Sequence, residues 1–203
     1  MLKIILLRPG STEYDRQQRI LGTLDMPLSP EGAGEVTAAI QGLNGAQPEM
    51  VYCCDCQSAI DTGEAVAAAF HVKCKPIKTL KNVNYGLWQG LLVDEVRRKQ
   101  PRVFKQWQEH PETICPPEGE MFAEVRERVE TSLTKLLKKH KQGSIVLVVP
   151  EPLAGIARSL LRHTELAEAW KTHGECGVSE TIEVERTSLS DPKQAVGSGV
   201  VQS

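Results

Sequence analysis

The feature that most constrains the fold is an uninterrupted apolar run late in the chain, Ser144–Val149 (Ser-Ile-Val-Leu-Val-Val). After the serine, no polar residue alternates with the apolar ones, so a strand formed here would be apolar on both faces. Such strands are typical of the centre of a parallel sheet that helices cover on both sides. The run therefore predicts an α/β fold.

The rest of the chain alternates between patterns typical of strands and of helices. Further strands are predicted at Leu2–Leu7, Met50–Cys54, near Pro76–Leu80 and, as an edge strand, at Thr181–Glu185. Helices are predicted from Ser29 to about Gln41, Ser58 to Phe70, Leu92 to His110 with a break at Pro101, Glu120 to His140 and Leu153 to Arg162. This alternation predicts a three-layer α/β/α sandwich with a mostly parallel central sheet.

The length of 203 residues fits one medium-sized domain. We expect the domain to span residues 1–187, because the Ser-, Gly-, Asp- and Pro-containing segment 188–203 is typical of a flexible C-terminal tail. The 24 basic and 26 acidic residues give a net charge of −2, which favours neither nucleic acid nor a membrane surface as a partner. No apolar run reaches the length of a membrane span, and the N-terminus lacks the pattern of a signal peptide, so we expect a cytoplasmic protein.

The six cysteines are too few for a disulfide scaffold, and free thiols are expected in a reducing compartment. The cluster Cys53-Cys54-Asp55-Cys56 raises the question of a metal site. Neighbouring residues of a strand point to opposite faces, however, so Cys53 and Cys54 cannot easily converge on one ion. We therefore expect neither a metal nor another cofactor.

Ligands of α/β sheets bind outside the carboxyl ends of the strands, so the residues after Leu7, Cys54 and Val149 are the candidates for a site. The motifs at these ends and between them, in chain order, are Arg8-Pro9-Gly10-Ser11-Thr12-Glu13, Arg19, Gly22, Asp25, Pro27-Leu28-Ser29, Gly32, Val51–Asp55, Ala59, Thr62, Glu64, Leu80, Asn84-Tyr85-Gly86, Trp88-Gln89-Gly90, Pro117, Gly119, Glu120 and the Ser144–Val149 run. As an ordered set covering about residues 1–165, they resemble the histidine phosphatase superfamily. The resemblance implies a phosphoglycerate-mutase-like fold.

The resemblance also implies which residue types a working site would need. In that family a histidine after the first strand accepts a phosphoryl group on an imidazole nitrogen. Two arginines and a second histidine surround the phosphate, and a carboxylic acid donates a proton to the leaving oxygen. This sequence has Pro9 at the nucleophile position, Ser58 at the second-arginine position, Asn82 at the acid position and Pro150 at the second-histidine position. Glu151 stands where glycine is usual.

Of the phosphate-contacting residues that the resemblance implies, Arg8 remains, with Ser11, Thr12 and Arg19 at the edge of the site. These four are the candidate anion-binding residues. For Arg8 an ion pair with Glu13 or Glu151 is an equal alternative. Trp88 is expected to pack beside the pocket rather than to stack on a ligand.

The four replacements favour a pseudoenzyme, a non-catalytic binding or regulatory module whose partner is another protein or a weakly bound phosphate-like anion. One alternative is a phosphatase or phosphomutase-like hydrolase that acts on a small phosphorylated or acidic molecule by replaced chemistry in the same cleft. None of the histidines at positions 71, 110, 140, 163 and 173 is expected to take over, whereas the cysteines near the second strand lie nearer the expected pocket. A third possibility is that the likeness is only architectural and function lies elsewhere, for example on the Pro111–Gly119 loop.

Overall fold

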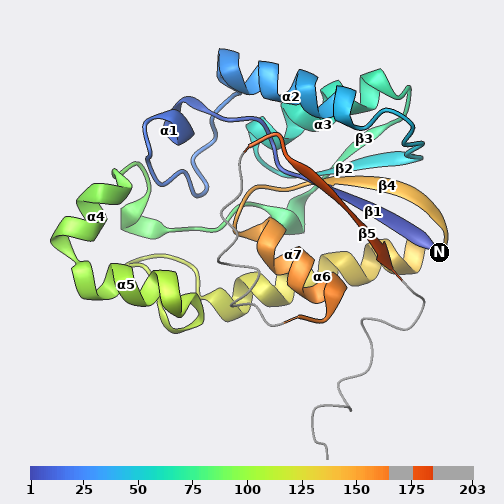
Figure 1. The fold of residues 1–203 in the computed structure, drawn as a ribbon. Coiled ribbons are helices and arrows are strands. Elements are labelled where there is room, and N and C mark those ends of the chain that lie inside the picture. Colours follow the sequence, from blue (N-terminus) through green and yellow to red (C-terminus); the bar gives the residue numbers. More distant parts are fainter. Residues whose placement is uncertain (165–175, 185–203) are drawn as a thin grey trace, which may run out of the picture.

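The computed structural model describes residues 1–164 and 176–184, and its centre is a five-stranded sheet with the order β3-β2-β4-β1-β5 (Figure 1). The strands are β1 (Leu2–Leu7), β2 (Met50–Cys54), β3 (Cys74–Ile77), β4 (Gly143–Val148) and β5 (Ser179–Val184). Strands β1 to β4 run parallel to one another, and β5 pairs antiparallel with β1 at the edge. The continuous apolar run thus forms the central strand β4, as the sequence predicts.

Helices cover both faces of this sheet, which confirms the three-layer α/β/α sandwich. Helices α2 (Pro30–Gly42) and α3 (Gln57–Ala69) lie on one face, and α6 (Phe122–Lys139) and α7 (Leu153–Arg162) lie on the other (Figure 1). Helices α1 (Glu13–Arg16), α4 (Val93–Lys99) and α5 (Pro101–Glu109) lie beyond the carboxyl ends of the strands. Three short 3-10 turns, η1 (Lys78–Leu80), η2 (Gly86–Trp88) and η3 (Pro111–Thr113), complete the described elements.

The core follows the hydrophobic patterns of the sequence. The last four residues of both β1 and β4 are buried. Helix α6 buries Val125, Val129, Leu133 and Leu136 against the sheet at the spacing of one helix face, as its periodicity predicts. Leu137, the next apolar residue along α6, is only partly buried.

One predicted strand boundary shifts in the structure, and one predicted helix break is confirmed. The third strand ends at Ile77 instead of Leu80, because its partner β2 ends at Cys54, the residue opposite Ile77. Residues 78–80 then turn into η1. The predicted break at Pro101 is confirmed: Gln100 ends α4, and Pro101 begins α5.

Some predictions concern residues outside the described ranges. The domain boundary at residue 187, the tail at 188–203 and Glu185 of the edge strand belong to this group. Within residues 1–164 and 176–184, no helix combines the length and the apolar character that a membrane crossing requires.

Candidate functional site

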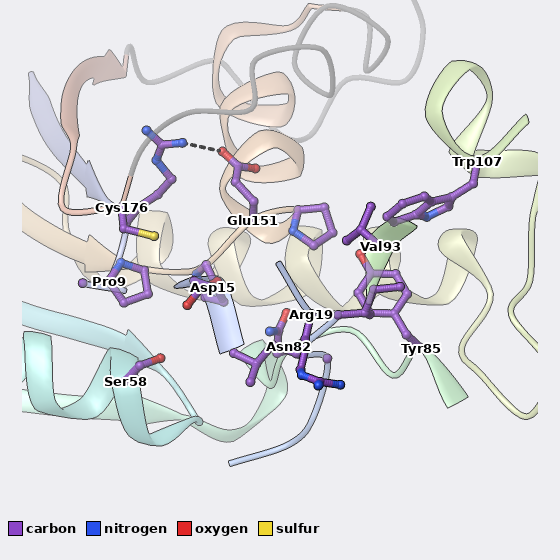
Figure 2. A pocket seen from close by; sticks show the side chains of 17 residues that line it. Pro9, Asp15, Arg19, Ser58, Asn82, Tyr85, Val93, Trp107, Glu151 and Cys176 are labelled. Atoms are coloured by element: carbon purple, nitrogen blue, oxygen red, sulfur yellow. Dashed lines mark ion pairs between the residues drawn. The ribbon is translucent and has the colours of Figure 1, made fainter. Parts of the chain in front are cut away.

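A cavity of about 270 Å³ opens beyond the carboxyl ends of β1 and β4 (Figure 2). Its walls come from the loops after β1 and β4, from the first turn of α3, and from the segments leading into α4 and β5. The lining residues are Arg8, Pro9, Gly10, Asp15, Arg19, Ile20, Leu21, Gly22, Ser58, Asn82, Tyr85, Val93, Trp107, Pro150, Glu151, Pro152 and Cys176. The fold therefore brings together all four positions at which the sequence departs from the family pattern, although they are far apart along the chain.

At these four positions the cavity presents two pyrrolidine rings, a hydroxyl and an amide. Pro9 and Pro150 carry no side-chain nitrogen, oxygen or sulfur that could attack phosphorus or donate a hydrogen bond. Ser58 and Asn82 are buried, with exposed fractions of 3% and 4%. None of the four side chains carries a charge, so they cannot offset the charge of a phosphate as arginine and histidine would.

Arg8, the residue that the resemblance places at the phosphate, already has an anionic partner. Its Nη1 lies 3.6 Å from Glu151 Oε1, and the two side chains are 10% and 24% exposed. The pairing with Glu151 is thus confirmed, whereas the alternative partner Glu13 lies beside Arg16 at 3.1 Å. The carboxylate of Glu151 supplies within the protein the negative charge that a bound phosphate would otherwise bring to Arg8.

Glu151 also connects the pocket to helix α7 and strand β5. Arg158 Nη2 lies 3.7 Å from Glu151 Oε1, and the Gly155 amide donates to Glu151 Oε2 at 3.0 Å. Arg158 pairs in turn with Glu180, which also binds Arg162 at 2.8 Å. Charges of alternating sign therefore run from the pocket to the edge of the sheet, and each is offset by its neighbours.

Ser11 and Thr12, two of the candidate anion-binding residues, are buried and do not line the cavity. The amide and hydroxyl of Ser11 donate to the carboxylate of Glu35 at 2.7 and 3.1 Å. Thr12 caps helix α1, and both its amide and its hydroxyl donate to Asp15 at 2.7 Å. Their polar groups serve the local fold.

The close approach of α2 to the end of β1 explains this inward arrangement. A Cβ on Gly10 would lie 2.3 Å from the Gly32 carbonyl oxygen, and a Cβ on Gly32 would lie 2.0 Å from the Ser11 carbonyl oxygen. Glycine at both positions allows the first turn of α2 to pack directly on the loop after β1. The loop is thereby fixed by α2 on one side, while Pro9 faces the cavity on the other.

Arg19, the fourth candidate, does line the cavity, yet its guanidinium is held by other groups. Its Nε donates to Gln17 Oε1 at 2.8 Å, and its Nη1 donates to the Gly90 carbonyl at 2.7 Å. The guanidinium also lies 5.9 Å from the centre of the Tyr14 ring. These contacts link the loop after α1 to the segment before α4.

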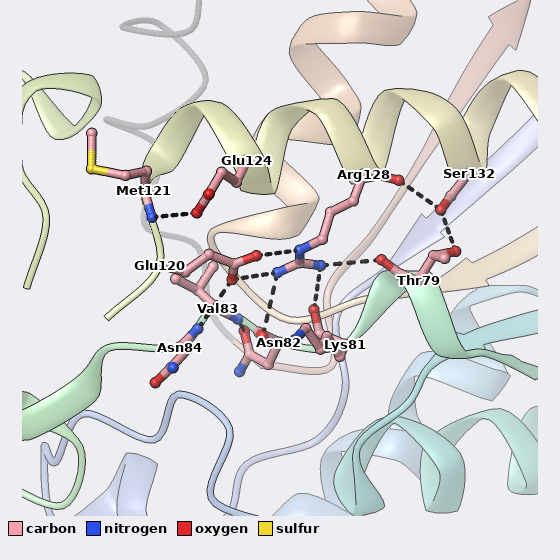
Figure 3. Close-up of polar contacts among 10 residues, drawn as sticks. All are labelled: Thr79, Lys81, Asn82, Val83, Asn84, Glu120, Met121, Glu124, Arg128 and Ser132. Carbon is pink, nitrogen blue, oxygen red and sulfur yellow. Dashed lines mark hydrogen bonds and ion pairs between the residues drawn. The ribbon is translucent and has the colours of Figure 1, made fainter. Parts of the chain in front are cut away.

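A clamp centred on Arg128 fixes the segment that carries Asn82 (Figure 3). The guanidinium binds both carboxylate oxygens of Glu120, at 2.8 and 3.0 Å. It also donates to the carbonyls of Thr79, Lys81 and Asn82, at 3.2, 2.6 and 3.4 Å. A bidentate pair of this kind is geometrically specific, so the clamp sets the position of Asn82 at the cavity wall.

An aromatic wall closes the side of the cavity near α4 and α5. The rings of Tyr85 and Trp107 meet edge to face with centroids 5.8 Å apart, and Val93 lies beside them (Figure 2). Trp88 packs behind Trp107 at 5.8 Å and is 2% exposed. Trp88 is therefore a packing residue, as expected from the sequence.

Comparison with known proteins identifies the family. The family model described as "Histidine phosphatase superfamily (branch 1)" matches residues 4–188. The chain belongs to the histidine phosphatase superfamily. It is 30% identical over 173 residues to a metal-independent phosphoserine phosphatase of Arabidopsis thaliana, covering 83% of this chain and 71% of the relative.

Two further likenesses agree with this membership. Over 148 residues the chain is 29% identical to phosphoserine phosphatase 1 of Hydrogenobacter thermophilus, covering 73% of this chain and 70% of that protein. The solved structure of Bacillus stearothermophilus YhfR superposes with a TM-score of 0.82 at 22% identity and covers 98% of both chains. The superposition supports the phosphoglycerate-mutase-like fold that the sequence resemblance implies.

With Pro9 at the nucleophile position that the resemblance implies, histidines and cysteines are the remaining candidate nucleophiles near the cavity. None of the histidines in the described ranges lines the cavity, and His173 lies outside those ranges. Of the cysteines near the second strand, Cys53 and Cys54 are buried in β2 and do not line the cavity, whereas Cys56 Sγ lies 3.9 Å from the hydroxyl of Ser58, which does. Cys176 itself lines the cavity, and no sequence motif pointed to this residue.

Cys176 and Tyr85 are both kept in their neutral forms. Burial raises the pKa of Cys176 to about 12, and the carboxylates of Asp15 and Glu35 add to this effect. Burial and, to a smaller extent, the charge of Glu151 raise the pKa of Tyr85. Since the thiolate is the nucleophilic form of cysteine, a protonated Cys176 is a poor replacement for the histidine. In the described part of the chain, no three His, Cys, Asp or Glu residues are grouped so that they could hold a metal ion.

Proposed function

We propose that this chain is a pseudoenzyme of the histidine phosphatase superfamily, a non-catalytic module whose pocket binds rather than transforms its ligand. One observation carries the proposal. Pro9, Ser58, Asn82 and Pro150, the residues at the chemical positions that the family resemblance implies, converge on one cavity. The prolines have no reactive side-chain atom, Asn82 is neither a charged clamp nor an acid, and among the described residues the Ser58 hydroxyl contacts only the sulfur of Cys56 at 3.9 Å, with no base beside it to activate it.

The size of the expected loss supports this proposal. Removing a single electrostatic donor from a site of this kind costs about 10²–10³ in rate. Removing the nucleophile eliminates the covalent route itself. Several such losses in one cavity leave too little of the family mechanism for turnover.

Phosphate binding is also disfavoured in this cavity. Its charged lining residues are Arg8, Arg19, Asp15 and Glu151, two of each sign, whereas phosphate sites carry an excess of positive charge. Arg8 is offset by Glu151 at 3.6 Å, and Arg19 is held by its own hydrogen bonds. We therefore regard a phosphate-like anion at Arg8 as a weak ligand at most, and a protein partner remains part of the proposed regulatory role.

The alternative of replaced chemistry needs another nucleophile in the cavity. Cys176 lines the cavity and is a candidate nucleophile by its position, but its pKa of about 12 leaves the thiol protonated near neutral pH. The carboxylate of Asp15 already accepts two hydrogen bonds from Thr12. No described contact in the cavity therefore favours this alternative.

The decisive experiment measures phosphomonoester hydrolysis by the purified wild-type protein beside its Arg8→Ala variant. A third protein carries Pro9→His, Ser58→Arg, Asn82→Glu, Pro150→His and Glu151→Gly, which restores the family residues to the cavity. We expect no turnover by the wild type above a buffer blank, with or without Arg8. Wild-type turnover that Arg8→Ala abolishes would place activity in this cavity and refute the proposal, and turnover by the restored variant alone would support it.

A further inference from the structure

The cavity retains features of a binding site although its chemical groups are lost. We infer that it takes a small uncharged molecule with an apolar ring and a hydrogen-bond acceptor, such as a carbonyl, in place of a phosphate ester. This inference rests on the proposed function and specifies the ligand class of the same pocket. It follows from four properties of the cavity wall: its charges, its available donors, its apolar surface and its size.

Among the described residues, each charge of the wall is offset by an opposite charge or held by hydrogen bonds, although Arg8 Nη1 itself makes no hydrogen bond. Arg8 pairs with Glu151, the Arg19 guanidinium donates to Gln17 and Gly90, and the carboxylate of Asp15 accepts from Thr12. A charged ligand would have to lose its hydration without gaining an unpaired counter-charge, which is costly. An uncharged ligand avoids this cost.

Asn82 supplies a hydrogen-bond donor that no described residue uses. Its Oδ1 accepts from the Val83 amide at 2.8 Å, which identifies this atom as the oxygen and the other as Nδ2. Within the described ranges Nδ2 has no acceptor, although the residue is only 4% exposed and lines the cavity. Because Asn82 lines the cavity, an acceptor on a ligand in the cavity could take this free donor.

Ser58 adds a second polar group to the wall, and its hydroxyl makes only a weak contact with another described side chain. Its hydroxyl lies 3.9 Å from the sulfur of Cys56, a weak contact, and the residue is 3% exposed. Serine can donate or accept, so it can adapt to the ligand group that Asn82 binds. Both side chains are neutral, and neither selects for an anion.

The remaining wall is apolar and aromatic. Tyr85 and Trp107 form its flat side, and Ile20, Leu21 and Val93 continue it. The volume of about 270 Å³ lies just below the range of roughly 300–1,000 Å³ that is usual for ligand pockets. A single ring with a short polar substituent suits this space, and the wall would pack against its ring.

The test titrates ¹⁵N-labelled full-length protein with benzamide, and separately with benzoate and phenyl phosphate, followed by NMR. Benzamide and benzoate have nearly the same shape and differ in charge. We expect benzamide to shift the resonances of Asn82, Tyr85 and Trp107 and to bind at least tenfold more tightly than either anion. Asn82→Ala should weaken benzamide binding about fivefold, the loss of one ordinary hydrogen bond. The matched control Asn44→Ala, in an exposed loop, should leave it unchanged.

Three results would overturn the inference: equal or tighter binding of an anion, no pocket shifts with benzamide at 20 mM, or benzamide binding that Asn82→Ala does not weaken. The titration with phenyl phosphate distinguishes failure of this inference from failure of the proposed function. If it binds more tightly than benzamide and no phenol is released, only the ligand class is wrong. If phenol is released and Arg8→Ala abolishes the release, the proposed function itself is wrong.

Discussion

The ion pair between Arg8 and Glu151 leads to a quantitative prediction about phosphate binding. Glu151→Gln removes one negative charge from the cavity and keeps the size of the side chain. Arg8 then loses the carboxylate 3.6 Å from its guanidinium, while Arg158 keeps its second partner, Glu180. The variant should therefore bind inorganic phosphate more tightly than the wild type does.

The magnitude follows from Coulomb's law. A phosphate that contacts Arg8 would lie roughly 5 Å from the Glu151 carboxylate, and an effective dielectric constant of about 40 suits a site between interior and surface. The repulsion is then about 1.7 kcal/mol for each unit of phosphate charge, or about 3 kcal/mol for the dianion. Removing it corresponds to a gain of roughly a hundredfold in affinity.

Isothermal titration calorimetry with inorganic phosphate, at constant ionic strength and pH 7.5, measures this gain. Glu183→Gln is the matched control, because Glu183 is an exposed partner of Lys3 at the edge of the sheet. The double variant Arg8→Ala with Glu151→Gln should lose the gain, and thermal melts would show that each variant is folded. Equal phosphate affinity in the wild type and a folded Glu151→Gln variant would refute the reasoning that Glu151 occupies the anion position at Arg8.

Four further predictions concern the thiols, the clamp, the core and pH. With iodoacetamide at pH 8, the exposed Cys115 should be alkylated at least a hundredfold faster than Cys176, whose pKa is about 12. Peptide mass spectrometry measures the two alkylation rates, and similar rates would contradict the raised pKa of Cys176. Arg128→Ala should lower the free energy of unfolding, measured in urea, by about 2–4 kcal/mol. The substitution leaves the partly buried carboxylate of Glu120 and three backbone carbonyls without their donor. A loss below about 0.5 kcal/mol would mean that the clamp is dispensable. Leu133→Ala, at a fully buried core position, should cost about 2–5 kcal/mol in the same assay, and a smaller loss would mean that the core closes around the gap. Burial and the charge of a neighbouring lysine lower the pKa of His140. The stability that this group contributes is therefore present above its unfolded-state pKa of about 6.5 and is lost as pH falls. Thermal melts from pH 7.5 to 5 should show a steeper loss of stability for the wild type than for His140→Gln, and parallel curves would contradict this.

The fold could be predicted from the sequence because its signals are local and repeated. The apolar run at β4, the periodic face of α6 and the proline at the start of α5 each determine an element through nearby residues alone. The end of β3 could not be placed in this way. It depends on where its partner β2 stops pairing, which is a property of the sheet and not of the segment.

The site was predictable as a set of positions but not as a set of contacts. The order of motifs placed Pro9, Ser58, Asn82 and Pro150 in one cavity, and the structure brings them together there. The sequence could not reveal that Cys176 completes the wall, because that residue precedes the edge strand and reaches the cavity only through the antiparallel pairing of β5 with β1.

The same limit applies to the candidate anion-binding residues. Ser11 and Thr12 match the motif, yet their polar groups are used by Glu35 and Asp15. The direction in which a loop residue points depends on the element packed against it, here the first turn of α2. A sequence motif specifies a residue type at a position and leaves this direction open.

The retention of Arg8 has a structural explanation that does not require phosphate. Its amide donates to the Val178 carbonyl at 3.1 Å, which joins the end of β1 to the segment before β5. Its guanidinium pairs with Glu151 after β4, and Glu151 pairs with Arg158 on α7. Arg8 can therefore hold three elements together here, with a carboxylate from the protein in place of the phosphate that the family resemblance implies. The cavity thus has its own internal charge balance, and this balance makes an uncharged ligand a better match than the phosphate esters that the names of its relatives describe.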